Sequence, residues 1–474
     1  MGRLIYVNGT HQTVAPAHRT PTPYATTIRS LSDRLVEASR PIRVLDAVRW
    51  DDRVEADFFA SDGRELPRVT RDYYGDRPLS FDPDRKREEY LELERDVRRQ
   101  LGDDNPAGRL LARRCQEGRS VVDLVAQRGT PAFATTSSQL YGSTADCCHE
   151  GGPPLALFGQ TLGHPIRDDA SDASEIEEAE VSAAEAVGDL SNRLTTFFSG
   201  APPVRVRLSD DIAADATAGT DYIKVRGDAR FTVREVRLLE VHEGWVHLGT
   251  TLNAQTQPTC TFLTKGTPSS TITQEGLAVL TEVLALASHP ARVRRLTHRV
   301  EAVALAEAGA NFLDVYRFYL EQGYDPREAY QHTTRVFRGS LPEDCGPFTK
   351  DLSYAKGFVL VSKFVRAALS AGQAELIPLL FCGKTSLVEI PDLAELAEDG
   401  LLLPPRYLPP PFADLKMLSA WTMGGDSWEA FQPIPSPAGA SGPNYSPRSA
   451  QRIAEENEKK SSQRVAQDHS IIRI

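Results

Sequence analysis

Two histidines and a glutamate lie close together in the stretch LLEVHEGWVHLGTTL, which spans residues 238–252. His242 and His247 are five positions apart, and Glu243 directly follows the first histidine. Imidazole nitrogens are common zinc ligands, and a glutamate beside such a ligand can act as a general base. In the helix-borne motif of zinc peptidases the two histidines are four positions apart. The stretch therefore differs from a known hydrolytic metal site by one residue.

The five-residue spacing sets a condition on the helix that carries it. Successive residues of an α-helix are rotated by about 100°, so side chains five positions apart diverge by about 140°. A π-bulge, in which residue i bonds to residue i+5, brings the two positions back into line, and Gly244 accepts unusual backbone angles. We therefore predict that the helix is distorted or ends between His242 and His247. The alternative is a pair of histidines in ordinary packing or solvent-exposed positions.

A second segment offers a third ligand. Thr271 followed three residues later by Gln274 is a capping box, which predicts a helix start and places Glu275 in its first turn. The Glu275 carboxylate is then either stabilised by the helix dipole alone or available to a zinc ion. Gly276 permits close approach of a neighbouring helix. Glu282 lies ~10.5 Å farther along the axis, too far to bind the same ion but able to orient a histidine N–H.

Other elements must position these residues. Thr232 followed three residues later by Glu235 is a further capping box and predicts a helix start near Val233, so the histidine pair lies in that helix. Before it, VRVRLS at 204–209 and YIKVRG at 222–227 are typical of strands. We expect the second strand to form a sheet edge that receives the substrate backbone.

The first part of the chain has a mostly helical pattern. IRSLSDRLVEASRPI and KREEYLELERDVRRQL carry apolar residues at three-and-four spacing, as amphipathic helices do. RVEADFFAS alternates and predicts a short strand. We expect an α+β fold that is predominantly helical and contains a small sheet.

Composition divides the 474 residues into segments, since so long a chain exceeds one ordinary core. RDDASDASEIEEAE is acidic and poor in apolar side chains, which is typical of a linker or an inserted loop. The predicted segments are a flexible arm at 1–24, a mostly helical unit at 25–165, an acidic linker or loop at 166–187, a catalytic domain at 188–427 and a disordered tail at 428–474.

Composition also excludes several partners. A net charge of -11 argues against a broad nucleic-acid surface, and we expect the one basic stretch, ARVRRLTHR at 291–299, to be a solvated helix face. No stretch reaches the ~20 apolar residues of a membrane span, and the start lacks a signal-peptide core. Six scattered cysteines indicate a reducing compartment. We therefore expect a cytoplasmic protein with no nucleic-acid or membrane partner. The sequence favours no particular oligomeric state.

The two ligand-bearing segments resemble a known family. VHEGWVH, NAQTQP and TQEGLAVLTE resemble the bacterial flavohaemoglobin expression-modulating QEGLA motif proteins, and QEGLA stands here at residues 274–278. That family is similar to the eukaryotic microtubule-associated tyrosine carboxypeptidases, zinc enzymes with a His-Glu-x-x-x-His motif and a downstream glutamate. The resemblance runs from about Thr26 to about Trp421 and includes GTPAFATTSSQLYGS and FRGSLPEDCGPFTKDLSYAKG.

The resemblance implies a zincin-like metallopeptidase of carboxypeptidase type. Its motif residues correspond to His242, His247 and Glu275 as ligands of one zinc ion per chain, with Glu243 as the catalytic base. The implied partner is the C-terminus of a peptide or protein substrate, whose peptide bond is hydrolysed.

An exopeptidase must hold the free terminal carboxylate of its substrate. Arginine suits this task because it binds carboxylates bidentately, and lysine can serve as a point charge. The candidates are Arg335, Arg338 and Lys350, and the phenol of Tyr354 is placed to stabilise an oxyanion. Each of these residues also has a purely structural alternative.

Other interpretations stay open at this point. One is a non-catalytic regulatory or scaffold protein that affects the expression of other proteins and has a structural metal site. Glu243 favours the enzyme, because a structural site needs ligands but no base. Another is hydrolysis of a small amide. DCCHE at 146–150 is a weaker metal candidate, since adjacent cysteines point poorly toward one ion. No nucleophile elbow or phosphate-binding glycine loop is present.

Overall fold

The computed structural model describes residues 21–148, 152–157, 180–200, 204–210, 212, 215–343 and 346–423. Most of the predicted N-terminal arm, most of the acidic linker and all of the predicted tail therefore lie outside the described residues. The predicted fold class is confirmed, because helices dominate and the strands form small sheets. None of the described helices is long and apolar enough to cross a membrane.

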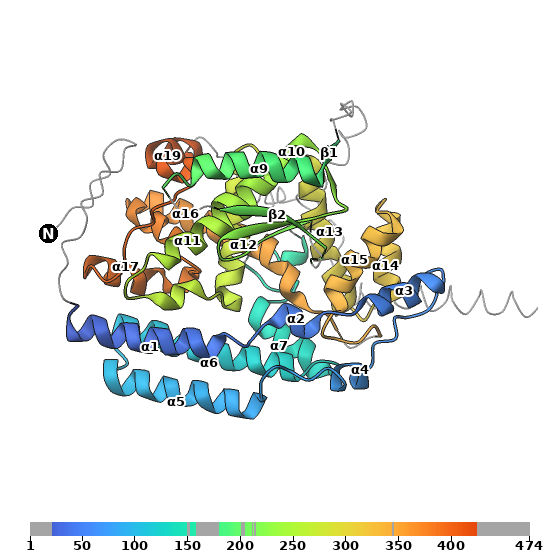
Figure 1. The fold of residues 1–474 in the computed structure, drawn as a ribbon, viewed down its shortest axis with the longest axis horizontal. Helices are drawn as coiled ribbons and strands as arrows, with labels where there is room; N and C mark the ends of the chain where they lie inside the picture. The colour runs from blue at the N-terminus through green and yellow to red at the C-terminus, as the bar shows by residue number, and fades with distance from the viewer. Residues whose placement is uncertain are drawn as a thin grey trace, which may run out of the picture. The chain divides into compact units, whose positions relative to one another are not determined.

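The first part of the chain is helical throughout its described elements. In Figure 1, α1, α5 and α6 lie side by side along one side of the molecule. The helices are α1 (Pro23–Ser39), α2 (Val44–Val48), α3 (Asp52–Ala60), α4 (Arg71–Gly75), α5 (Pro83–Leu101), α6 (Pro106–Ala126) and α7 (Pro131–Tyr141).

The predicted strand RVEADFFAS is wrong, because these residues form α3. The Asp51 side chain caps this helix by accepting hydrogen bonds from the backbone N–H groups of Arg53 and Val54. Val54 and Phe58, four positions apart, are buried on one face. The Asp51 cap and the four-residue spacing of Val54 and Phe58 favour a helix more strongly than the short alternation of polar and apolar residues favours a strand.

Two small sheets accompany the helices. Both predicted strands are confirmed as β2 (Arg205–Ser209) and β4 (Tyr222–Arg226), and β3 (Ala216–Ala218) joins them in a sheet of order β2-β4-β3. The expectation that YIKVRG forms a sheet edge is wrong, because β4 is the central strand and β3 lies at the edge. The second sheet pairs β1 (Val181–Ser182) with β5 (Arg230–Phe231).

The remaining elements surround a pair of closely packed helices, α12 and α16. Helix α9, which packs on β2, covers the three-stranded sheet in Figure 1. The elements are α9 (Ala183–Phe197), α10 (Val233–Leu239), η1 (Glu240–Leu248), α11 (Gly249–Gln255), η2 (Thr261–Thr264), α12 (Pro268–Leu284), α13 (Pro290–Glu307), α14 (Phe312–Glu321), α15 (Pro326–Phe337), η3 (Thr349–Asp351), α16 (Leu352–Ser370), η4 (Ala374–Phe381), η5 (Leu387–Glu389), α17 (Ile390–Glu398), α18 (Pro410–Ala413) and α19 (Leu415–Met423).

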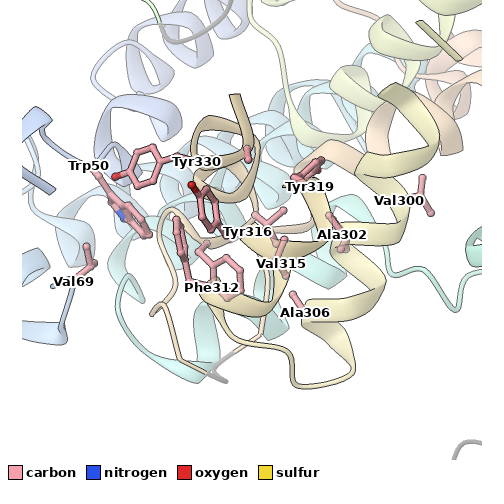
Figure 2. Close-up of a cluster of buried hydrophobic side chains, with 14 of the residues drawn as sticks. Trp50, Val69, Val300, Ala302, Ala306, Phe312, Val315, Tyr316, Tyr319 and Tyr330 are labelled. Atoms are coloured by element: carbon pink, nitrogen blue, oxygen red, sulfur yellow. The ribbon is translucent and has the colours of Figure 1, made fainter. Parts of the chain in front are cut away.

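An aromatic core joins the first part of the chain to the later helices. Figure 2 shows Trp50 beside Phe312, and the two rings lie 5.7 Å apart between centroids. Phe58 of α3 contacts Tyr316 and Tyr330, each at a centroid distance of 5.0 Å. The described residues up to Met423 belong to one compact unit. The division into units at 25–165 and 188–427 stays a prediction.

Candidate metal centre and active site

The histidine-bearing segment is a π-helix. A helix begins at Val233 with the predicted Thr232–Glu235 capping box and becomes η1 at Glu240. The predicted distortion between His242 and His247 is therefore confirmed. Because a π-helix returns residue i+5 to the azimuth of residue i, the two Nε2 atoms come within 3.2 Å of each other.

Gly244 has a different role from the one we expected. Its φ is not positive, so unusual backbone angles are not what it supplies. Instead, a Cβ atom at this position would lie 2.4 Å from Cδ2 of Leu194. Glycine is needed there because α9 packs directly against the π-helix.

Helix α12 brings Glu275 to the same place. The predicted start at Thr271 is wrong, because the helix begins at Pro268 and Thr267 is its N-cap. The reason is that proline favours the first helical turn and Thr267 forms the capping box with Ser270. Glu275 therefore lies beyond the first turn. The predicted close approach at Gly276 is confirmed, since a Cβ atom there would lie 2.0 Å from the backbone of Gly357 in α16.

The three atoms form a nearly equilateral triangle. Oε2 of Glu275 lies 3.4 Å from Nε2 of His242 and 3.5 Å from Nε2 of His247, and the two nitrogens are 3.2 Å apart. Ligands about 2.0–2.1 Å from a tetrahedral zinc ion are separated by about 3.3–3.4 Å. Oε2 of Glu275 is buried without a hydrogen-bond partner. The donor set and its spacing therefore fit a zinc ion.

The site is electrostatically suited to a cation. Burial lowers the pKa of His242, but the carboxylates of Glu275 and Glu282 outweigh it and raise this pKa to about 10. Burial alone would raise the pKa of Glu275, yet His242 and His247 hold it well below its usual range. Carboxylates that favour a proton on a buried imidazole also favour a divalent ion in its place.

Glu282 touches the outer side of this site. Its Oε1 lies 2.6 Å from Nδ1 of His242, where it directs Nε2 toward Glu275. Arg292 of α13 donates to both oxygens of Glu282, at 3.0 and 2.9 Å. The expectation that residues 291–299 form a solvated face is wrong for Arg292, which is buried in this pair. The sequence sign of this burial was that Arg292 lies in a helix that also carries apolar residues at helical spacing.

Glu243 lies beside the ligand triangle. His242, Glu243 and His247 each place a ligand atom within 4.8 Å of the others. The Glu243 Oε2 atom accepts a hydrogen bond of 2.8 Å from the backbone N–H of Ala218 in the edge strand β3. Glu275 completes the triangle at 3.4 and 3.5 Å from the two histidines, and Glu243 lies beside it with one carboxylate oxygen bonded to the sheet.

A cationic region adjoins the triangle. Lys350 Nζ lies 3.8 Å from Oε1 of Glu275, and the Tyr354 ring stacks on His242 at a centroid distance of 6.2 Å. Arg335 forms a bidentate pair with Asp351, at 2.7 and 2.9 Å. Burial lowers the pKa of Arg335, whereas Asp351 and Tyr354 raise it, with a net increase. Arg335 is thus a partner of Asp351.

Two further arginines in this region have buried nitrogens without hydrogen-bond partners among the described residues. Nε of Arg338 is one such atom, and Nε and Nη1 of Arg299 are two more. Burial, followed by the charge of Arg335, lowers the pKa of Arg338 to about 10. The Arg299 guanidinium lies over the Tyr354 ring at 4.6 Å. Arg299 was not among the sequence candidates, because only the fold places α13 beside α16.

The remaining candidate does not join this site. In DCCHE, Cys147 is exposed and Cys148 is half-buried, and both are free. The histidine and glutamate that follow them lie outside the described residues. Among the described residues, the one group of three or more potential ligands that converges is His242, Glu243 and His247, and Glu275 adjoins it.

Comparison with known protein families gives a match over most of the chain. A sequence model of the family described as microtubule-associated tyrosine carboxypeptidase matches residues 56–425. The match covers more than half of the chain and includes η1, α12 and the cationic region. No curated protein matches the chain.

Proposed function

Because the chain belongs to the microtubule-associated tyrosine carboxypeptidase family, we propose that it is a zinc-dependent peptidase of carboxypeptidase type. Membership of this family supports a peptidase that acts on a protein or peptide. The observation that carries the zinc assignment is the triangle formed by His242, His247 and Glu275. We also propose that the chain is related to the QEGLA motif proteins, on the strength of residues 274–278.

An open site favours catalysis over a structural metal. A structural zinc ion is usually enclosed by four protein ligands, whereas a catalytic one leaves a position open to water. The described residues offer three converging atoms, and the nearby Glu243 is bonded to Ala218 instead. This arrangement favours an enzyme over the non-catalytic regulatory alternative.

Glu243 is the proposed general base. Zinc, when bound, supplies a Lewis acid that acidifies water and polarises a scissile carbonyl. Glu243 takes the proton of the attacking water and passes it to the departing amine. The hydrogen bond from Ala218 fixes one carboxylate oxygen, so the other is directed to this task. His242 is kept in the tautomer with its proton on Nδ1 by Glu282, which leaves Nε2 free to bind the metal.

Arg338 and Lys350 are the proposed holders of the terminal carboxylate. Arg338 has a buried Nε atom without a hydrogen-bond partner among the described residues, and a substrate carboxylate would supply an acceptor for it. Lys350 borders the candidate ligand Glu275, so a carboxylate bound to it would lie near the metal. Arg335 is paired with Asp351 and orients this region, and Tyr354, whose ring stacks on His242, is assigned the role of hydrogen-bond donor to an oxyanion.

The test combines metal analysis with peptide digestion. We expect purified protein to bind one zinc ion per chain and to shorten peptides with free C-termini, but not C-terminally amidated ones, as read by mass spectrometry. Glu243→Gln retains zinc and loses about 10²–10⁴-fold in kcat/KM. Glu240→Gln is the matched control, because Glu240 lies in the same π-helix but pairs with Arg237.

The outcomes separate the parts of the proposal. A wild-type protein without stoichiometric zinc contradicts the enzyme assignment. Zinc binding without cleavage of any peptide favours the regulatory alternative. Cleavage of amidated peptides at the same rate contradicts the carboxypeptidase assignment and points to an endopeptidase or to the hydrolysis of other amides.

A further inference from the structure

Lys384 contacts both helices that carry the candidate ligands. It follows η4 in the chain, and its Nζ atom lies 2.9 Å from the carbonyl oxygen of His247 in η1. The same atom lies 3.3 Å from Oε1 of Gln274, the residue before Glu275 in α12. Oγ1 of Thr250 is a third acceptor at 3.0 Å. An ammonium group has three N–H bonds, so its donors match these acceptors.

These contacts hold the histidine helix at its widened turn. The carbonyl oxygen of His247 also accepts from Oγ1 of Thr251 at 2.8 Å. Two side-chain donors therefore converge on one carbonyl of the π-helix. Of these two donors, Lys384 comes from outside this helical segment.

The other end of the arrangement is Gln274. Its Oε1 also accepts from Oγ1 of Thr250 at 2.7 Å, and its amide nitrogen donates to the carbonyl of Gly383 at 3.4 Å. Both ends of this amide are therefore fixed. Because Gln274 and Glu275 are consecutive, fixing the first side chain also fixes the rotation of α12 that aims the second.

The loop that carries Lys384 is itself anchored. The backbone N–H of Lys384 donates to the carbonyl of Leu263 at 2.8 Å. A Cβ atom at Gly383 would lie 2.7 Å from Cβ of Leu263, so only glycine allows this approach. The lysine therefore reaches the ligand helices from a rigid base.

Burying an ammonium group without a carboxylate partner costs free energy, and packing alone gives no reason for a charged side chain here. Burial lowers the pKa of Lys384 to about 8, and the charges of Glu243 and Glu275 oppose this shift. A leucine or methionine would fill similar space without that cost. The charge is compensated by neutral acceptors on the two ligand helices, which indicates a role in holding them.

We propose that Lys384 is a positioning residue of the metal centre, which fixes η1 and α12 relative to each other through the His247 carbonyl and the Gln274 amide. The proposal rests on the proposed function, because it assumes that these helices share a zinc ion. Lys384 itself touches neither the metal nor the substrate.

The test is the zinc affinity of Lys384→Met, measured by competition with a chromogenic chelator. We expect an affinity about 10–100-fold below that of the wild type, as for other residues that orient ligands. We also expect an altered visible spectrum of the cobalt-substituted protein, since cobalt absorption reports ligand geometry. Lys356→Met is the matched control, because Lys356 is a part-buried lysine that pairs with Asp146 instead. It should keep the zinc affinity and the cobalt spectrum of the wild type.

A wild-type affinity and spectrum in Lys384→Met overturn the proposal, as does a loss no greater than in Lys356→Met. Gln274→Met provides a second test should Lys384→Met fail to fold, because it removes the acceptor on α12 and leaves the lysine its other partners. The zinc affinity of Gln274→Met should be about 10-fold below that of the wild type, and an unchanged affinity overturns the proposal. A wild-type chain that binds no zinc contradicts the proposed function itself and takes this inference with it.

Discussion

Two neighbouring regions of the molecule carry opposite charge. The metal region consists of His242, His247, Glu275 and Glu282, and its carboxylates surround two imidazoles. The cationic region consists of Arg299, Arg335, Arg338 and Lys350 around Asp351 and Tyr354. The regions meet where Lys350 approaches Glu275 and where Tyr354 stacks on His242.

The atoms without partners differ in kind between the two regions. In the metal region the buried atom without a hydrogen-bond partner is an acceptor, Oε2 of Glu275. In the cationic region such atoms are donors, on Arg299 and Arg338. Buried polar groups normally have hydrogen-bond partners. Among the described residues, the metal region therefore lacks a positive partner for its carboxylate oxygen, and the cationic region lacks acceptors for its arginine nitrogens. A cation suits the first region and an anion the second, as a metal-dependent carboxypeptidase requires.

The largest expected effect is on the metal region, through Glu282→Leu. This change leaves Arg292 buried without its partner, and we expect a loss of about 3–5 kcal/mol in unfolding free energy. Urea unfolding in the presence of a chelator measures it without a contribution from metal. The double variant Glu282→Leu/Arg292→Met should recover most of the loss. Glu395→Leu, at an exposed pair with Arg109, should cost under about 1 kcal/mol. Equal losses of unfolding free energy in Glu282→Leu and Glu395→Leu would contradict the structural importance of the buried Glu282–Arg292 pair.

In the cationic region, removing a buried charge should leave the unfolding free energy unchanged or increase it. Arg338→Met removes a buried charge that has no carboxylate partner among the described residues, so stability should stay equal or rise. The same change should lower kcat/KM on peptides with a free C-terminus by about 100-fold, since a charge-assisted bond is worth about 1.5–3 kcal/mol. Thermal unfolding and peptide digestion measure the two effects. A destabilised variant with full activity would mean that Arg338 is structural.

The convergence of the candidate ligands could be expected from the sequence, because the two histidines are close together in the chain. The spacing of His242 and His247 required a distorted helix, and the resemblance supplied Glu275. Arg292, Arg299 and Lys384 were missed because their roles depend on contacts between elements far apart in the chain. No periodicity identifies a lysine whose acceptors lie 137 and 110 positions away.

A smaller effect is expected from pH, through His332 beside the cationic region. Burial, then Arg299 and Arg335, lower the pKa of His332 to about 3, against the opposing effect of Asp351. The unfolded chain binds a proton below pH ~6.5 that the folded chain does not. Stability is therefore fully present above pH ~6.5 and falls by about 1.4 kcal/mol per pH unit below it. The other groups that face the ring are Arg295, Tyr319 and Tyr324.

The variant His332→Phe isolates this effect. It keeps the ring that stacks on Tyr319 at a centroid distance of 5.2 Å and removes the titration. Urea unfolding of both proteins between pH 7 and 5 should show a smaller loss of stability for the variant. Parallel pH profiles would mean that His332 is protonated in the folded protein, and the cationic region would then be more open to solvent than the structure indicates.

The smallest expected effect concerns the start of α12, which the sequence placed at the wrong threonine. Thr267 accepts from the backbone N–H of Ser270, whereas Oγ1 of Thr271 donates to the carbonyl of Thr267 inside the helix. Thr267→Ala should therefore cost about 1 kcal/mol, as the loss of an N-cap does, and Thr271→Ala should cost less. Chemical unfolding of the two variants compares them directly. A larger loss for Thr271→Ala would restore the later start and bring Glu275 back into the first turn, where the helix dipole rather than a metal would account for its charge.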